Sequence, residues 1–339
     1  MSLRIEAVDP ADPAGFAPFY EVYAAACRHG AAGEFATVWQ PEELRLALTD
    51  DERTFRLGWN GWLGDRVVAT GWLQGSKLDN LDLADVLVCC PPQDRGRGHA
   101  AELLSHVEGQ ARARGRSRLV GEVTWPSAWG GAGAGSEDLA WARRQGFALG
   151  LVDVQRRLAL PVAEAHLDAL AAEAAPHHAA YSLRSFTGPV PGDLVEQWAA
   201  LAATLMTEAP MGDIEREAEH PGVDALRAGE ALLAAQGRVK VSTGALSADG
   251  ELVAYTDIAV TVHESERAYQ WGTLVSPAHR GHRLGLAVKV ANLRLLQESH
   301  PQLTTVVTYN ADVNAPMVAV NGHLGFRPVA WLGELQKRL

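Results

Sequence analysis

Cysteine is scarce in this 339-residue sequence, which contains Cys27 and the adjacent pair Cys89 and Cys90. No C-x-x-C or Cys/His spacing is present, so no metal site is predicted, and an adjacent pair in an apolar run is typical of a buried strand. A run of eighteen apolar residues is also missing, and the start, MSLRIEAVDPADP, has no apolar secretory segment. We therefore expect a cytoplasmic protein without membrane contact.

Basic residues are also few compared with acidic ones. The sequence has 30 Lys and Arg against 41 Asp and Glu, a net charge of −11. Nucleic-acid binding draws mainly on clustered cations, so a nucleic-acid partner is not expected, whereas a cationic small substrate suits this balance. The hydrophobic fraction of 47% and the chain length allow two domains of ordinary size. Nothing in the sequence indicates an oligomeric state.

The chain contains an internal repeat. An apolar strand, a Pro-containing loop with Arg-Gly, and an amphipathic helix occur in 86–111 and again in 276–296. Further landmarks recur in the same order at a nearly constant separation, which indicates a tandem duplication. The matching pairs are Arg66 with Glu251, Arg95 with Arg280, Thr124 with Thr308, and Gly146 with Gly325.

Each copy has the pattern of an α+β domain. Each copy begins with a strand and one or two helices, followed by three strands of which the first two form a hairpin. A helix, a strand, a second helix and a final strand come after them. This order predicts a mixed, mostly antiparallel sheet flanked by helices. In the second copy we expect a helix over 282–299, between the strands AYQWGTLV and LTTVVTY. The predicted domains are 1–160 and 177–339, joined by an alanine-rich linker over 161–176.

The loop SPAHRGHRLG, at the start of the 282–299 helix, has the features of an anion site. A helix N-terminus presents unpaired N–H groups and a partial positive charge, and glycines let a phosphate approach them. A dinucleotide-binding fingerprint is an alternative in the first copy, where Gly96-x-Gly98-x-x-Ala101 precedes Glu122. That fingerprint belongs to the first strand and helix of a parallel sheet, whereas this one follows an antiparallel hairpin.

The repeated pattern resembles the GNAT superfamily of acyl-CoA-dependent N-acyltransferases over nearly the whole chain. The Q/R-x-x-G-x-G/A loop is complete in the first copy, from Gln93 to Ala100. In the second copy, Ala278 replaces the initial Gln/Arg and Arg283 replaces the second glycine. The two-unit layout resembles mycothiol synthase and other tandem members, and TYNADVNAPMVAVNGHLGF is similar to the second unit of bacterial tandem members.

The resemblance implies that acetyl-CoA is the co-substrate, without a metal. Its pantetheine arm would pair with Leu274 and Val275, and with Tyr309 and Asn310 where the two strands splay, with a bulge at Gly272. Asn314 would flank the site, or only cap the following helix. The pyrophosphate would bind the two loops, at His279, Arg280, Gly281, His282, Arg283, Leu284 and Gly285, and at Gln93, Arg95, Gly96, Arg97, Gly98, His99 and Ala100.

The implied reaction is N-acetylation of a primary amine on a small molecule, by direct attack in a ternary complex. The amine must lose a proton, and the candidate bases are Asp257 and Glu208. The N–H of Leu274 or Val275 would meet the thioester oxygen. The tyrosine that commonly protonates the thiolate is replaced by Asn321 in the second copy and by Ala142 in the first. The alternative is a protein that binds CoA without catalysis.

The second copy is the predicted catalytic unit. In the first copy, the glycine-rich segment 127–136 stands where the resemblance implies an asparagine-bearing loop. The acidic segment 206–222 is a candidate acceptor-side lid, or a solvated face. Tyr269 and Trp271 either pack in the core or line the acceptor site. Asp257, in an apolar strand, either meets a substrate ammonium or has a backbone partner.

Overall fold

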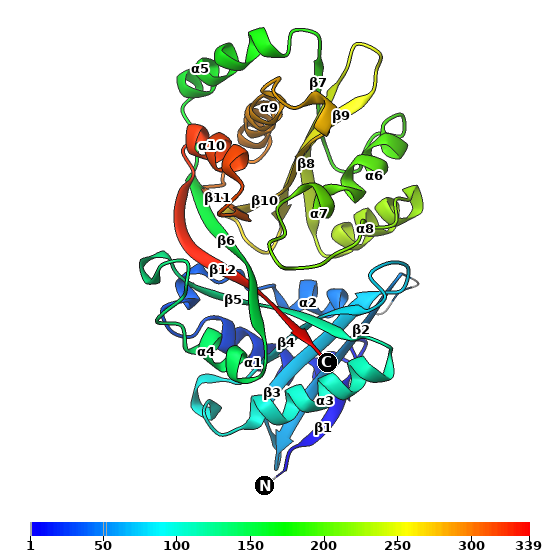
Figure 1. Ribbon diagram of the computed structural model, residues 1–339, viewed down its shortest axis with the longest axis vertical. Helices are drawn as coiled ribbons and strands as arrows, with labels where there is room; N and C mark the ends of the chain where they lie inside the picture. The colour runs from blue at the N-terminus through cyan, green and yellow to red at the C-terminus, as the bar shows by residue number, and fades with distance from the viewer. Residues whose placement is uncertain (1, 50, 52) are drawn as a thin grey trace. The chain divides into compact units, whose positions relative to one another are not determined.

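A computed structural model describes residues 2–49, 51 and 53–339. The chain forms two compact units (Figure 1). The first unit comprises Met1–Asp153, Gly212–Glu215 and Ala330–Leu339, and the second comprises Val154–Met211 and Arg216–Val329. No helix in the described ranges is long and apolar enough to cross a membrane.

The first unit is built on a mixed sheet with the strand order β1-β2-β3-β4-β5-β12. Only β4 and β5 run parallel, and the other neighbouring pairs are antiparallel. The strands are β1 (Arg4–Val8), β2 (Thr54–Leu63), β3 (Arg66–Ser76), β4 (Leu83–Cys89), β5 (Arg118–Pro126) and β12 (Arg327–Arg338).

Helices cover both faces of this sheet. The helices α1 (Pro13–Cys27) and α2 (Pro41–Ala47) share one aromatic-rich cluster with β3 and β4. The helices α3 (His99–Ala113) and α4 (Glu137–Arg144) contribute to the other, larger core. Short 3-10 turns occupy Gly33–Phe35, Pro92–Asp94 and Ser127–Trp129.

The second unit repeats the plan with the strand order β6-β11-β10-β9-β8-β7. The strands β7 to β10 pair antiparallel, while β10 and β11 run parallel. All ten residues of β9 are buried, as expected for a central strand with helices on both faces. The strands are β6 (Ala148–Ala159), β7 (Ser182–Thr187), β8 (Arg238–Leu246), β9 (Leu252–Thr261), β10 (Arg267–Val275) and β11 (Thr305–Ala311).

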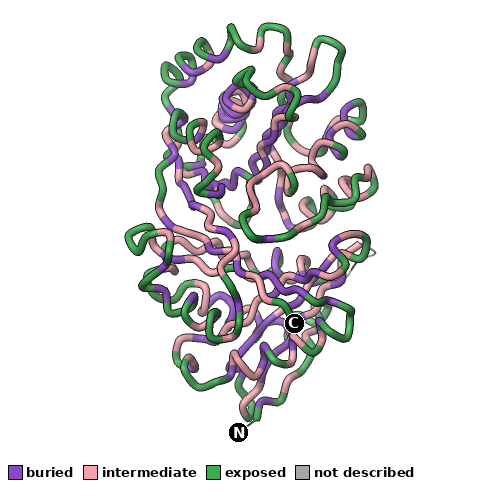
Figure 2. The backbone as a smooth tube through the Cα atoms, in the orientation of Figure 1, coloured by how far each residue is buried: buried purple, intermediate pink, exposed green. Residues whose placement is uncertain are grey.

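On one face of the second sheet lie α6 (Val195–Ala203), α7 (Leu205–Glu208) and α8 (Val223–Ala235). The other face holds α5 (Glu164–Ala174), α9 (Leu284–Ser299) and α10 (Ala315–Leu324). Helix α9 packs against β7 to β10 and is largely buried (Figure 2), which matches an apolar pattern on nearly every side. Short 3-10 turns occupy Ala175–His177 and Pro277–His279.

Two α+β units with mixed, mostly antiparallel sheets confirm the predicted fold class. The unit boundaries differ from the predicted ones. The second unit begins at Val154, inside β6, and Gly212–Glu215 is grouped with the first unit. The predicted linker 161–176 contains α5, whose Leu167, Leu170 and Ala174 belong to the core of the second unit. The end of β12 belongs to the first unit, because its residues from Ala330 onward pair with β5.

Candidate functional site

The predicted anion loop of the second unit lies between β10 and α9. Gly281 adopts a φ of +88°, a conformation that favours glycine. Arg283, the N-cap of α9, also has a positive φ, at +51°. In the first unit Gly98 caps α3 with a φ of +88°. The second loop therefore keeps the left-handed N-cap even though arginine replaces glycine there.

The loop leaves a row of backbone donors without partners. Among the residues that the structure describes, no acceptor meets the N–H groups of 281–285. After this row, the next backbone N–H along the chain, that of Leu286, donates to Arg283 O at 3.1 Å. Converging N–H groups at a helix N-terminus form an anion site, because the helix dipole adds to their partial charge. The predicted residues Leu284 and Gly285 form the first turn of this helix.

The cationic side chains of the loop are held by neighbours. Arg280 contacts Glu208, with Nη2 at 2.7 Å from Oε2, and Arg283 pairs with Glu173. The candidate base Glu208 therefore reaches the loop, and it does not line the cavity described below.

The two histidines of the loop contact the segment that precedes β7. The Nδ1 atom of His279 lies 3.0 Å from the hydroxyl of Tyr181. The Nδ1 atom of His282 lies 3.2 Å from the backbone oxygen of His177, and its ring packs beside Tyr181. Sequence reasoning missed Tyr181 because only the fold brings it to the loop.

The strands β10 and β11 separate next to the loop, as predicted. Their parallel pairing runs from Arg267↔Thr305 to Gln270↔Thr308 and ends there, although both strands continue. The register between β9 and β10 shifts between Gln270 and Thr273, which confirms the predicted bulge at Gly272. Past this point, Leu274 and Val275 of β10 are paired only with β9.

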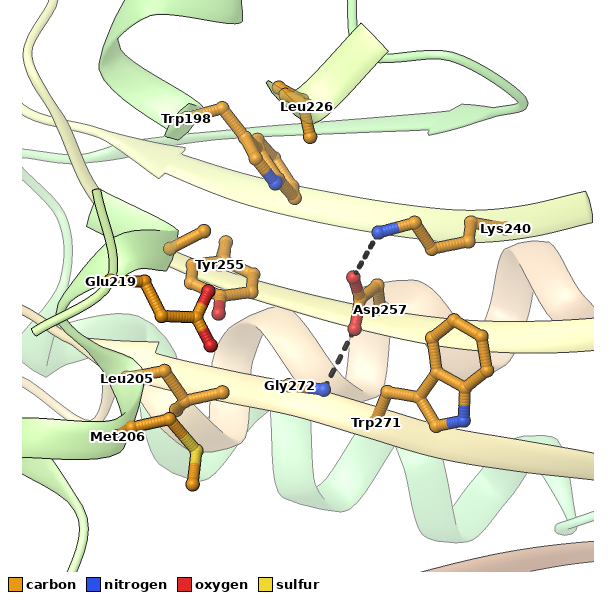
Figure 3. A pocket seen from close by; sticks show the side chains of 11 residues that line it. Trp198, Leu205, Met206, Glu219, Leu226, Lys240, Tyr255, Asp257, Trp271 and Gly272 are labelled. Carbon is orange, nitrogen blue, oxygen red and sulfur yellow. Dashed lines mark hydrogen bonds and ion pairs between the residues drawn. The ribbon is translucent and has the colours of Figure 1, made fainter. Parts of the chain in front are cut away.

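The bulge binds the carboxylate of Asp257, on the central strand β9 (Figure 3). The Gly272 N–H donates to Oδ1 at 2.8 Å, and Lys240 Nζ lies 2.8 Å from Oδ2. Asp257 is 5% exposed, so this pair is largely desolvated. The backbone partner predicted as one alternative for Asp257 is therefore present. Sequence reasoning did not single out Lys240.

A cavity of about 240 Å³ opens beside the bulge, with Asp257 in its wall. Trp271 also lines it and is 39% exposed, whereas Tyr269 does not and donates to Glu264 instead. The acidic segment 206–222 contributes Glu219, an exposed residue. Burial, with smaller contributions from Asp257 and Glu219, raises the pKa of Tyr255 above its usual range. The other lining residues are Trp198, Ala202, Leu205, Met206, Leu226, Lys240 and Gly272.

Asn321 sits in a buried polar chain between α9 and α10. Its Oδ1 accepts from Lys289 Nζ at 3.0 Å, and its Nδ2 donates to Asn310 Oδ1 at 3.0 Å. Arg156 donates to the same Asn310 oxygen at 2.8 Å. Lys289 is 2% exposed and lies over the Phe326 ring, and burial lowers its pKa to about 7. Sequence reasoning missed Lys289.

Asn314 caps α10, which is one of its two predicted roles. Its Oδ1 accepts from Met317 N at 3.2 Å. Asn310 directs its side chain into the buried polar chain, and its Nδ2 also donates to the Ala311 backbone oxygen at 3.0 Å. No cluster of three or more His, Cys, Asp or Glu side chains that could hold a metal occurs in the described part of the chain.

The first unit has a similar loop with different contacts. Gly96 and Gly98 have φ angles of +75° and +88°, and His99 and Ala100 begin α3, while Gln93 lies in the turn before them. The arginines on this loop pair with acids, as Arg95 contacts Asp138 and Arg97 lies 3.7 Å from Asp94.

In the first unit, apolar side chains occupy the positions that match the cavity wall of the second unit. By the separation that relates the two copies, Trp72 stands where the second unit has Asp257, and Leu87 where it has Gly272. These two residues pair directly, and the register between β3 and β4 runs from Thr70↔Cys89 to Gln74↔Asp85 without a shift. The Tyr23 ring packs 5.7 Å from the Trp72 ring. The bulge and the charged pair of the second unit are therefore replaced by apolar packing.

Solved structures with the same architecture agree with the predicted resemblance. A tandem GNAT protein from the clavulanic acid biosynthesis pathway aligns with 99% of this chain and 98% of its own, at 24% identity and a TM-score of 0.78. A GCN5-related N-acetyltransferase from Sphaerobacter thermophilus aligns with 99% of this chain and 95% of its own, at 14% identity and a TM-score of 0.63. No protein-family model matches the chain, and neither does any curated protein. The chain has the fold of two GNAT domains in tandem.

Proposed function

From its tandem GNAT fold, we propose that the chain is an acetyl-CoA-dependent N-acetyltransferase and that its second unit carries the chemistry. The observation that supports this most strongly is the combination of free N–H groups over 281–285 with the separation of β10 from β11. Neither feature alone is specific to CoA binding. Together they provide an anion site next to strand backbone that is not paired between β10 and β11.

Acetyl-CoA would place its pyrophosphate on the 281–285 donors. Its pantetheine arm is peptide-like and would pair with β10 at Leu274 and Val275, and with β11 at Tyr309 and Asn310. The acetyl group would then lie near the β10 bulge, at the edge of the cavity. The cavity in turn would hold the amine.

In the proposed reaction, the neutral amine nitrogen attacks the thioester carbonyl carbon. The C–N bond forms, the C–S bond breaks, and the products are the amide and CoA, with one proton released. The N–H of Leu274 or Val275 would stabilise the oxygen that gains charge, because a fixed donor needs no reorganisation in the transition state. Positioning of the two substrates supplies a further share of the rate.

Three carboxylates near the site can take the proton of the incoming ammonium. Asp257 is held by Gly272 and Lys240, and Glu208 by Arg280, so either would have to exchange these bonds to act as a base. Glu219 lines the cavity and is in contact with solvent. Glu219 is therefore a further candidate base, since a base must be within reach of both the amine and water to turn over.

The leaving thiolate would be met by Asn321 in place of the usual tyrosine. An amide cannot transfer a proton near neutral pH, so Asn321 acts through its N–H groups. Its Oδ1 faces the Lys289 nitrogen, which fixes the orientation of the amide and leaves one Nδ2 hydrogen beyond the bond to Asn310. In the first unit the matching Ala142 has no such group.

A thiol-release assay with acetyl-CoA and a panel of amines tests this function. We expect CoA release that depends on the amine, with the acetylated amine identified by mass spectrometry. Acetyl-CoA alone is expected to raise the melting temperature, because a ligand that binds only the folded state stabilises it. Stabilisation by acetyl-CoA without turnover of any amine would instead indicate the alternative, a protein that binds CoA without catalysis.

A further inference from the structure

The wall of the second-unit cavity is mainly aromatic and aliphatic (Figure 3). The rings of Trp198 and Tyr255 stand with centroids 5.0 Å apart, and Trp271 borders the opposite side. Leu205 and Met206 of α7 complete this wall. Most hydroxyl groups of an amino sugar or aminoglycoside would face apolar side chains here, which is costly. The wall therefore favours an apolar skeleton, and its rings favour an aromatic one.

Three charged side chains reach this cavity. Lys240 and Asp257 neutralise each other at 2.8 Å. Glu219 brings a further carboxylate to the side away from Trp271 (Figure 3). A carboxylate there suits an ammonium group, which the aromatic faces also attract. The additional ammonium groups of a polyamine would meet the apolar wall, and a substrate carboxylate would meet two acidic side chains.

The size of the cavity favours a small acceptor. Its volume of about 240 Å³ is below the roughly 300–1,000 Å³ that is usual for sites of drug-sized ligands. One ring with a short amine-bearing chain suits a cavity of this size.

We propose that the acceptor is a small aromatic monoamine, with a single primary amine on a short chain and no carboxylate. This inference rests on the proposed function and narrows its substrate class. The ring would lie among Trp198, Tyr255 and Trp271. The amine would extend past Glu219 toward the bulge at Gly272, where the acetyl group of acetyl-CoA is placed.

The test compares kcat/KM for four amines with acetyl-CoA and the full-length chain. Phenethylamine is the aromatic monoamine, spermidine the polyamine, glucosamine the amino sugar, and phenylalanine the amine with an added carboxylate. We expect phenethylamine to exceed each of the other three by at least about tenfold, in keeping with the unpaired polar or charged group that each of them would bury.

A variant pair shows whether the cavity causes this preference. Trp271→Ala should lower kcat/KM for phenethylamine by about tenfold and change that for ethylamine, which has no ring, by less than about threefold. Trp129→Ala is the matched control, because Trp129 has a similar exposure of 37% and lies in the first unit. It should change neither value.

A second pair tests the charge at the cavity. Glu219→Gln should lower kcat/KM for phenethylamine at least several-fold, while the KM for acetyl-CoA stays the same. Glu217→Gln, two residues earlier and outside the cavity lining, should have no effect. A melting temperature measured for each variant shows that the fold is intact.

Failure of this inference differs from failure of the proposed function. Turnover with spermidine, glucosamine or phenylalanine equal to or above that with phenethylamine would overturn the aromatic monoamine class and leave the acetyltransferase function standing. An unchanged phenethylamine preference in Trp271→Ala would also overturn it. Absence of CoA release with every amine would contradict both.

Discussion

At the scale of single residues, Lys289 is the feature that sequence reasoning could not anticipate. It follows LGLAV in α9, and a lone lysine in an apolar helix is expected to reach solvent. The structure instead buries it against Asn321 and Phe326, both brought there by the packing of α10. Burial lowers its pKa to about 7, well below the value of about 10.4 of an unfolded chain.

This lysine should make the free energy of unfolding depend on pH. Between about pH 7 and pH 10 the folded state holds Lys289 neutral while the unfolded state binds a proton, so stability rises with pH in this window. One proton corresponds to a slope of about 1.4 kcal/mol per pH unit. In Lys289→Met this contribution is removed.

Urea unfolding of both proteins at several pH values measures it. We expect the free energy of unfolding of the wild type, minus that of Lys289→Met, to increase from pH 7 to pH 10. Below pH 7 the difference should level off, because both states then bind the proton. A difference that is flat across the whole range would show that Lys289 stays charged in the folded protein.

Asn321 is the second residue with a measurable role. Asn321→Ala should lower turnover by about ten- to a hundredfold and leave the KM for acetyl-CoA nearly unchanged, because hydrogen bonds made in the transition state are lost. Its melting temperature should also fall, since Lys289 and Asn310 lose a partner.

Asn292→Ala separates these two effects. Asn292 is also fully buried on α9, where it bonds to Val241 and Thr243 away from Asn321. We expect a lower melting temperature with turnover preserved. If turnover falls in step with the melting temperature in both Asn292→Ala and Asn321→Ala, then Asn321 only stabilises the packing of the helices.

At the scale of elements, the β10 bulge lies beside both the cavity and the point where β10 and β11 separate. The sequence predicted it at Gly272, since an isolated glycine in a strand often marks a bulge. It could not predict what binds the bulge, because Lys240 and Asp257 come from two other strands whose register is set by the whole sheet. The positive φ of Arg283 could not be predicted either, because arginine rarely adopts this conformation.

Gly272→Ala should disturb the bulge and the cavity together. A Cβ atom at this position would lie 2.8 Å from the Tyr255 hydroxyl oxygen and ring. We expect the ring to shift, with a loss of stability of about 1–3 kcal/mol and a higher KM for the amine. The free energy of unfolding and steady-state kinetics measure both effects.

Gly229→Ala is the matched control for that change. Gly229 lies in α8, where an added Cβ meets nothing within 4 Å. Alanine is favoured in helices, so this variant should be as stable as the wild type or slightly more so, with the same kinetics. Wild-type amine KM in Gly272→Ala would mean that the bulge does not shape the acceptor site.

At the scale of the whole molecule, the internal repeat predicted two units of one fold. The exact boundaries were not predictable, because the alternating pattern of β12 suits pairing in either unit, and the alanine-rich 161–176 segment shows its buried face only against α9. The divergence of the units was visible in part, from Ala142 and the 127–136 segment. The separation of the copies aligns Trp72 with Asp257, but the bulge in one unit and its absence in the other required the register of both sheets.

The central claim is that the loop of the second unit holds acetyl-CoA for the reaction, and the turnover of three Gly→Asp variants tests it most directly. Gly281, Gly96 and Gly250 all have a positive φ, and an added Cβ meets nothing within 4 Å at any of them, so the backbone strain is matched. Gly281→Asp places a carboxylate at the pyrophosphate donors, Gly96→Asp alters the first loop, and Gly250→Asp alters only a hairpin turn. We predict that Gly281→Asp loses nearly all turnover at acetyl-CoA concentrations that saturate the wild type, while Gly96→Asp and Gly250→Asp keep most of it. Full turnover in Gly281→Asp, or its loss in a folded Gly96→Asp protein, would contradict the account.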